Sequence, residues 1–142
     1  WPKETRNDVN YHDIKIENYG ISWNLDGGDA FAINPDSVHE AGCIHTSQGL
    51  EFDYVGVIIG DDLKYRDGKI VTDYSKRAKT DQSMKGIKGL AKENPEKANQ
   101  IADEIIKNTY RTLMTRGMKG FYVYCTDKKL ADYLKKRLKN RG

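Results

Sequence analysis

The run Tyr54-Val55-Gly56-Val57-Ile58-Ile59 is apolar and shows no polar side chain at alternate positions. A strand with one face in water alternates apolar and polar residues, whereas a strand covered on both faces does not. The run therefore predicts a parallel strand, buried on both faces, inside an α/β sheet. No other segment constrains the fold as strongly.

Helical patterns follow in the C-terminal half. Asn94-Pro95 predicts a helix start, because Asn can cap a helix and Pro fits its first turn. Apolar residues then recur at steps of three or four through Met114. The predicted inward face of this helix is Ala98, Ile101, Ala102, Ile105, Thr109 and Leu113.

A second β-prone run at 121–125 precedes a final helix, capped by Thr126 or Asp127. That helix is expected to turn Leu130, Leu134 and Leu138 inward. Strands that alternate with helices predict an α/β fold with a largely parallel sheet and flanking helices. The 142 residues suit one domain, 1–142.

Charge is distributed unevenly along the chain. Residues 1–60 hold three Lys or Arg against ten Asp or Glu, whereas 61–142 hold 21 against 11. A basic half can attract a polyanion, although a solvated Lys-rich surface explains the same numbers. We predict a basic insertion at about 63–93, with a hairpin at Asp67-Gly68 and a mobile loop from Ser75 to Glu93, whose lysines touch nucleic acid or have no partner.

No apolar run is long enough to cross a bilayer, so we expect no membrane partner. Cys43 and Cys125 lie in apolar stretches, which favours a reducing, cytoplasmic location. The opening Trp1-Pro2-Lys3 has no leader and no initiator Met, so a fragment is expected.

Two polar segments are candidates for chemistry. The first runs from a brief β-prone stretch, Cys43 to Thr46, through Ser47-Gln48-Gly49-Leu50-Glu51-Phe52 to the apolar strand. Gly49 would let a phosphate or sugar approach the backbone, because it has no Cβ. In the second segment, Thr115-Arg116-Gly117 ends the long helix just before a strand, and the planar fork of an Arg suits phosphate.

These two segments, with Trp23-Asn24 upstream, resemble motifs V and VI of superfamily 1 helicases. The wording "IHTSQGLEFDYVGVIIG" and "NTYRTLMTRGMKGFYVYC" is most similar to the Schlafen group 3-like DNA/RNA helicase family, known as bacterial proteins. The resemblance implies the second RecA-like domain of a P-loop NTPase, with a three-layer sheet. It also implies ATP with Mg²⁺, shared with an N-terminal RecA-like domain of the same polypeptide, and single-stranded DNA or RNA as partner.

The resemblance further implies residue roles. Arg116 would be the arginine finger, Glu51 would accept a ribose hydroxyl, and Gln48 and Gly49 would line the nucleotide side. The predicted nucleic-acid side is His45, Thr46 and Ser47, with Arg111 and Lys119 as weaker candidates. Each feature also has a purely structural explanation, since an Arg at a helix end can bond the last carbonyls and His45 can be an ordinary strand histidine.

The chain contains no Gly-x-x-x-x-Gly-Lys-Ser/Thr phosphate loop, so it would hold only half of an ATP site and be inactive alone. An alternative hypothesis is a noncatalytic nucleic-acid-binding or protein-interaction module with the same fold. A nuclease lacks a convincing constellation of acidic residues, Asp61-Asp62 is a weak metal pattern, and no His/Cys cluster has zinc spacing.

Overall fold

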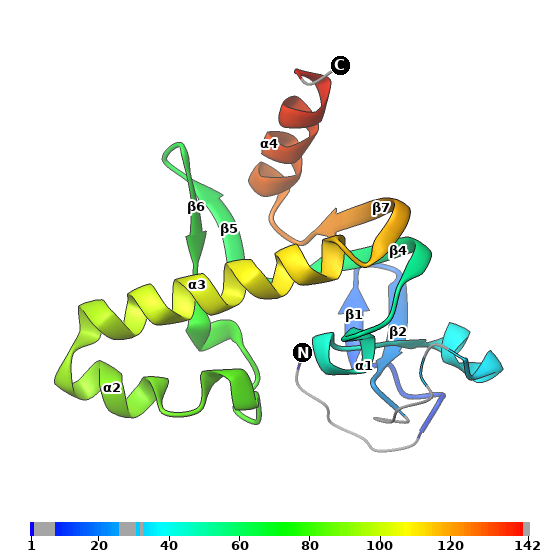
Figure 1. Cartoon of the computed structure of the whole chain (residues 1–142), viewed down its shortest axis with the longest axis horizontal. Helices are drawn as coiled ribbons and strands as arrows, with labels where there is room; N and C mark the ends of the chain where they lie inside the picture. The colour runs from blue at the N-terminus through cyan, green and yellow to red at the C-terminus, as the bar shows by residue number, and fades with distance from the viewer. Residues whose placement is uncertain (2–7, 26–30, 32, 141–142) are drawn as a thin grey trace.

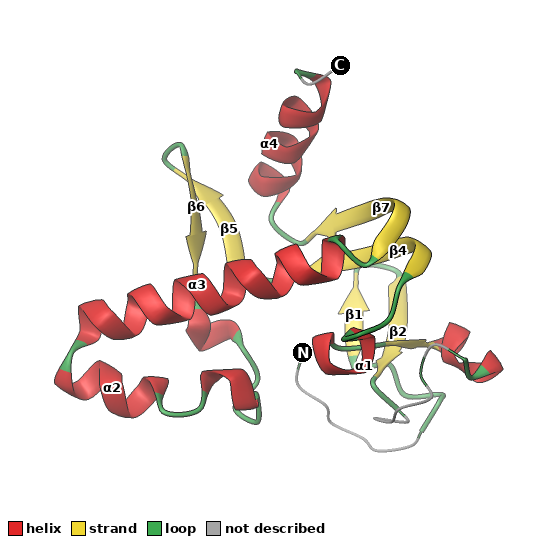
Figure 2. Ribbon diagram, in the orientation of Figure 1, coloured by secondary structure: helices red, strands yellow, loops and turns green. Residues whose placement is uncertain are grey.

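The computed structural model describes residues 1, 8–25, 31 and 33–140 (Figures 1 and 2). Its strands are β1 (Ile14–Ile16), β2 (Tyr19–Trp23), β3 (Glu40–Ala41), β4 (Phe52–Ile59), β5 (Leu63–Arg66), β6 (Lys69–Thr72) and β7 (Gly117–Cys125). Its α-helices are α1 (Ile44–Ser47), α2 (Ile87–Glu93), α3 (Pro95–Met114) and α4 (Lys128–Lys139). Three short 3₁₀ helices are η1 (Pro35–His39), η2 (Tyr74–Lys76) and η3 (Gln82–Met84).

The described strands form three small sheets, ordered β1-β2-β3, β4-β7 and β5-β6. Pairing is parallel between β2 and β3 and between β4 and β7, and antiparallel in the other two pairs. The mixed α/β class is therefore confirmed, including the parallel placement of the apolar run and the hairpin at Asp67-Gly68. A three-layer arrangement is not confirmed by these sheets.

One face of the β4–β7 pair carries the main core. Val57 and Ile59 are buried there with Cys125, and Ile106 and Tyr110 of α3 belong to the same cluster. Figure 2 shows α3 running past this pair as the longest helix. The long helix is thus anchored to the strands by its buried face.

The opposite face of β4–β7 is open, so the prediction that the apolar run is covered on both faces is wrong. The parallel register places Gly56 opposite Tyr122 and Ile58 opposite Tyr124, and partners in register share a face. Tyr54 is 58% exposed and Tyr122 72% exposed. Aromatic rings fill the outer face where aliphatic packing was expected.

The predicted start of α3 is confirmed. Asn94 caps the helix by accepting the Lys97 N–H at 3.0 Å, and Pro95 occupies the first turn. The buried stripe runs at steps of four residues through Ala98, Ala102, Ile106 and Tyr110. The predicted inward face was therefore partly wrong. It omitted the buried Ile106 and Tyr110 and included Ile101, Ile105 and Thr109, which are only half-buried.

Helix α4 begins as predicted, with the Asp127 side chain accepting the Leu130 N–H at 3.1 Å. Leu130 is buried, but Leu138 is 68% exposed, so the prediction that Leu138 faces inward is wrong. Figure 1 shows the reason, because the C-terminal part of α4 projects away from the rest of the molecule.

Two further expectations of local structure are corrected. The stretch from Cys43 to Thr46 is largely helical, forming most of the single turn α1 instead of a strand. The segment 75–93, expected as a loop, contains parts of η2 and all of η3 and α2. Ile87 gives this insertion a buried anchor against Ala98 and Ala102 of α3.

A buried ion network, which no local sequence pattern predicts, ties the insertion to the core. Arg77 pairs with Asp62 at 3.0 Å and with Asp81 at 2.7 Å. The Tyr110 hydroxyl donates to the other Asp62 oxygen at 2.5 Å and accepts the Gly60 N–H at 3.1 Å. Asp61-Asp62 is a weak metal pattern in the sequence, and in the structure Asp62 serves instead to join Arg77 of the insertion to Tyr110 of α3.

The electrostatics of this network follow from burial and pairing. Burial, then the charge of Asp62, raises the pKa of the Tyr110 hydroxyl. Burial opposes ionisation of Asp81, but hydrogen bonds from Ser83 and Arg77 outweigh it and lower the pKa of that carboxyl. The stabilisation from Asp81 is therefore present above the ordinary carboxyl range and is lost as pH falls through the lowered pKa.

Within the residues that the structure describes, none of the helices combines the length and apolar character needed to cross a bilayer.

We expect Arg77→Met to lower the free energy of unfolding by about 3–5 kcal/mol, because it leaves the Asp62 carboxylate buried without its cation. The Asp62 side chain is only 6% exposed. The measurement is urea denaturation followed by circular dichroism. The matched control is Lys107→Gln, which breaks an exposed pair with Asp103 at 2.7 Å and should cost less than about 1 kcal/mol. Equal losses in the two variants would contradict the proposed role of the network.

Candidate functional site

The first candidate segment is organised by the turn α1. The Thr46 hydroxyl accepts the Cys43 N–H at 2.9 Å and donates to the Cys43 carbonyl at 3.0 Å. The Ser47 hydroxyl also donates to the Cys43 carbonyl, at 3.0 Å. Both hydroxyls are therefore engaged within the turn. Contacts from Thr46 and Ser47 to nucleic acid stay a prediction.

After α1 the chain bends at Gly49, whose φ of +80° lies in the left-handed region. The Leu50 N–H bonds back to the Ser47 carbonyl at 3.3 Å and closes the bend. No heavy atom lies within 4 Å of the position that a Gly49 Cβ would occupy. The bend therefore presents open backbone to its surroundings.

Most of the predicted polar side chains around this bend are accessible. His45, Gln48 and Glu51 are exposed. Their accessibility leaves them free to contact a ligand, and nothing in the described structure pairs Glu51 or His45 with a hydrogen-bond partner or an opposite charge.

The second candidate segment ends α3. The Thr115 N–H bonds to the Arg111 carbonyl at 3.0 Å, and the Arg116 N–H bonds to the Leu113 carbonyl at 3.2 Å. These bonds complete the last turn. Arg116 is thereby fixed at the point where α3 gives way to β7.

A backbone hydrogen bond joins the two segments. The Phe52 N–H donates to the Arg116 carbonyl at 2.9 Å, and Phe52 lies opposite Gly117 in the parallel register. The structure thus brings the bend at Gly49 and the residue Arg116 to the same end of the β4–β7 pair. We call this region, 45–52 with 115–117, the junction. Sequence reasoning predicted both segments but could not see this contact, which is made by backbone atoms.

The junction lies at the amino ends of β4 and β7, because both segments precede their strands. Open α/β sheets usually hold their own ligands at the carboxyl ends of the strands. The junction is therefore not at the end of the strands where such sheets usually hold a ligand of their own.

The Arg116 side chain carries the strongest chemical signal in the junction. Its Nε is buried and has no hydrogen-bond partner in the part of the chain that the structure describes. No ion pair between described residues involves Arg116. Buried donors are almost always paired, and an unpaired one costs about 1–3 kcal/mol, more when the group is charged. The Nε of Arg116 is therefore a buried donor without an acceptor among the described residues.

The two weaker candidates differ in their surroundings. Arg111 is exposed on α3, just over one turn before Arg116. Lys119 pairs with Asp53 at 2.7 Å, and both side chains are more than half exposed. Such a surface pair contributes little and can be exchanged for a phosphate contact. Among the described residues, no group of three His, Cys, Asp or Glu side chains could hold a metal ion.

Comparison with known proteins agrees with the motifs. The family model described as Schlafen group 3, DNA/RNA helicase domain, matches residues 1–127. The chain is similar to an uncharacterized protein of Saccharomyces cerevisiae, with 33% identity over 100 residues. That alignment covers 70% of this chain and 21% of the yeast protein, so the matched part spans about a fifth of its relative. A yeast relative gives no support to the expected bacterial origin. No solved structure gives a significant match.

We expect Gly49→Ala to lower the free energy of unfolding by about 1–2 kcal/mol, because a side chain in the left-handed region is strained even where space is open. Gly56→Ala is the matched control, since a Cβ there also meets no atom within 4 Å but φ is not positive. It should change stability by less than about 1 kcal/mol, in the stabilising direction. Chemical denaturation of both variants measures the difference. Indistinguishable values would show that the bend does not depend on the glycine.

Proposed function

Because this chain belongs to the Schlafen group 3 DNA/RNA helicase domain family, we propose that it is the second RecA-like domain of an ATP-dependent helicase-like NTPase. The ATP site would be completed by an N-terminal RecA-like domain of the same polypeptide. Membership of the family indicates a helicase-like domain with a nucleic-acid-related role.

The observation that carries the proposal is the unpartnered Arg116 Nε at the junction. A protein that keeps a charged donor half-buried without an acceptor loses stability, unless a ligand supplies the acceptor. Phosphate oxygens match the planar fork of the guanidinium. The geometry therefore suits an arginine that completes its hydrogen bonds on a triphosphate bound by another domain.

In this mechanism, ATP would be held with Mg²⁺ mainly by the N-terminal domain, and it would supply the γ-phosphate for in-line attack by water. Arg116 donates N–H groups to phosphate oxygens and stabilises the charge that develops on them. The exposed Glu51 accepts a hydrogen bond from a ribose hydroxyl. Gln48 and the open backbone of Gly49 line the side of the junction that faces the nucleotide. Anchoring Arg116 through its own carbonyl to Phe52 keeps the guanidinium in place as the domains close.

The nucleic-acid side of the proposal uses the remaining predicted residues. His45 and Arg111 are exposed, and Lys119 can exchange its pairing with Asp53 for a backbone phosphate. Thr46 and Ser47 would contribute through the turn that they stabilise. Binding of single-stranded DNA or RNA by such groups is mainly electrostatic and should fall steeply with salt.

The three-layer RecA-like arrangement belongs to the same proposal. The open face of β4–β7 presents Tyr54, Tyr122 and Tyr124, each at least 45% exposed. An exposed aromatic patch of this kind marks a contact surface. Further helices of the longer polypeptide would cover it. A cytoplasmic location is proposed with it, in agreement with two free cysteines.

The decisive experiment replaces Arg116 with Met in the full-length protein. We expect hydrolysis of ATP, stimulated by a single strand, to fall by about 10³–10⁵-fold, as for other arginine fingers. The free energy of unfolding should stay the same or rise, because Met fills the space without burying an unpaired charge. The measurements are phosphate release and chemical denaturation.

Lys97→Met is the matched control, since it removes an exposed cation from the same helix and should leave hydrolysis unchanged. Full activity of Arg116→Met would remove the central residue from the mechanism. It would favour the alternative function, a noncatalytic binding module. A large loss of stability in Arg116→Met would assign the arginine a structural role.

A further inference from the structure

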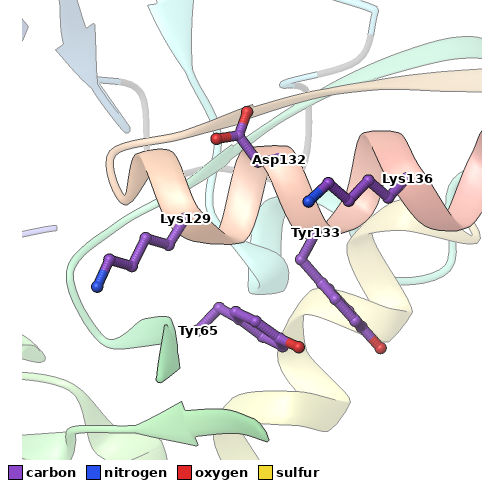
Figure 3. Close-up of a pocket in the computed structure, with 5 residues that line it drawn as sticks. All are labelled: Tyr65, Lys129, Asp132, Tyr133 and Lys136. Atoms are coloured by element: carbon purple, nitrogen blue, oxygen red, sulfur yellow. The ribbon is translucent and has the colours of Figure 1, made fainter. Parts of the chain in front are cut away.

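A pocket lies between β5 of the hairpin and α4. It is lined by Tyr65, Lys129, Asp132, Tyr133 and Lys136 (Figure 3). We call it the tyrosine groove. Helix α4 follows the carboxyl end of β7, whereas the junction lies at the amino end of the same strand. The two sites therefore sit at opposite ends of the β4–β7 pair.

Two tyrosines form the floor of the groove. The rings of Tyr65 and Tyr133 stack with centroids 4.3 Å apart and planes inclined by 17°. Both are half-buried and pack against the main core. This packing holds them as rigid, preformed surfaces and joins α4 to the hairpin. It does not explain the cations beside them.

Two lysines flank the rings. Lys129 and Lys136 are seven residues apart, so they lie on the same side of α4, and both are exposed. No ion pair between described residues involves either lysine. The nearby carboxylate of Asp127 is taken by Arg66 at 2.9 Å. The Asp132 carboxylate points away from the two rings in Figure 3.

The other residues of α4 add to the positive charge beside the groove. Between 128 and 139 it carries six basic residues against the single acidic Asp132. The pocket has a volume of about 260 Å³. That lies below the roughly 300–1,000 Å³ of pockets for whole drug-sized ligands. The space suits one planar ring held between flanking cations, with the rest of the ligand outside.

We propose that the tyrosine groove binds a single-stranded nucleic acid, with one base against the tyrosine pair and the adjoining phosphates at Lys129 and Lys136. Aromatic faces accept any base, and lysines neutralise the backbone on either side. The inference shares with the proposed function only the chemical class of its partner. It assigns a binding site that is separate from the ATP-facing junction and does not need ATP.

The test measures binding of a labelled twelve-nucleotide oligo-dT and oligo-U to the full-length protein by fluorescence anisotropy, without ATP. Lys129→Gln combined with Lys136→Gln should weaken binding about tenfold or more at 0.1 M salt. It should also reduce the salt slope by about 1.4, at about 0.7 for each lost phosphate contact on a single strand. The matched control, Lys128→Gln combined with Lys139→Gln, removes the same charge from the same helix outside the groove and should have a much smaller effect.

A second variant tests the stacking. Tyr133→Leu keeps apolar bulk but loses the ring face, so affinity should fall about tenfold. The quenching of a 2-aminopurine placed in the oligonucleotide should be lost with it. Melting curves establish which variants are folded. If Tyr133→Leu does not fold, the two double-lysine variants alone decide the test.

The outcomes separate this inference from the proposed function. If the two double-lysine variants lose the same affinity, binding depends on the general positive charge of α4, and the proposed binding site in the groove is wrong. Unchanged binding in the groove variants would also overturn it, while leaving the mechanism at Arg116 intact. If the wild-type protein fails to bind either oligonucleotide but its ATP hydrolysis still requires Arg116, the groove fails and the arginine finger stands. Binding by Arg116→Met at the wild-type level supports two separate sites.

Discussion

The hydrogen bond from the Phe52 N–H to the Arg116 carbonyl is the contact on which the rest of the arrangement depends. It starts the parallel pairing of β4 with β7 and fixes where the helix before β7 must end. The bond uses only the backbone of Arg116, so the guanidinium takes no part in this contact. One interaction therefore aligns two segments that are distant in sequence and frees the side chain that carries the proposed chemistry.

Rigidity behind that contact comes from two different forces. Ile106 and Tyr110 pack α3 against the core of β4 and β7. Nearer the start of the helix, Ala98 and Ala102 pack against Ile87 of α2, which lies alongside α3 in Figure 1. The buried pairing of Arg77 with Asp62 then fastens the insertion to the same helix through Tyr110. Because α3 is packed along its length, the position of its C-terminal end, where Arg116 follows, is well defined.

Much of this could be predicted from local signals and much could not. The cap at Asn94, the hairpin at Asp67-Gly68 and the strand from Tyr54 to Ile59 are set by residues close in sequence, and these elements are confirmed. The inward face of α3 was misplaced because Tyr110 carries a polar group, whose partner Asp62 is known only from the fold. The β propensity of Cys43 to Thr46 predicts a strand, but the segment forms the turn α1. The prediction is wrong because hydroxyl groups of Thr46 and Ser47 bond to the Cys43 backbone and stabilise the turn. The motifs located Gln48, Glu51 and Arg116 in sequence, but only the parallel register places them at one end of two strands.

The unpaired Arg116 Nε and the open aromatic face of β4–β7 point in the same physical direction. Each is a feature that a self-contained domain would be expected to avoid, since one leaves a donor unsatisfied and the other leaves large rings in water. Under the proposed function, both would be resolved by the approach of another surface, with phosphate oxygens accepting hydrogen bonds from the guanidinium and apolar side chains covering the tyrosines. Sequences lose such features unless they are used, because replacement by well-packed residues raises stability. Their coexistence agrees with the proposal that this chain, whose matched part spans about a fifth of its yeast relative, works together with a further domain.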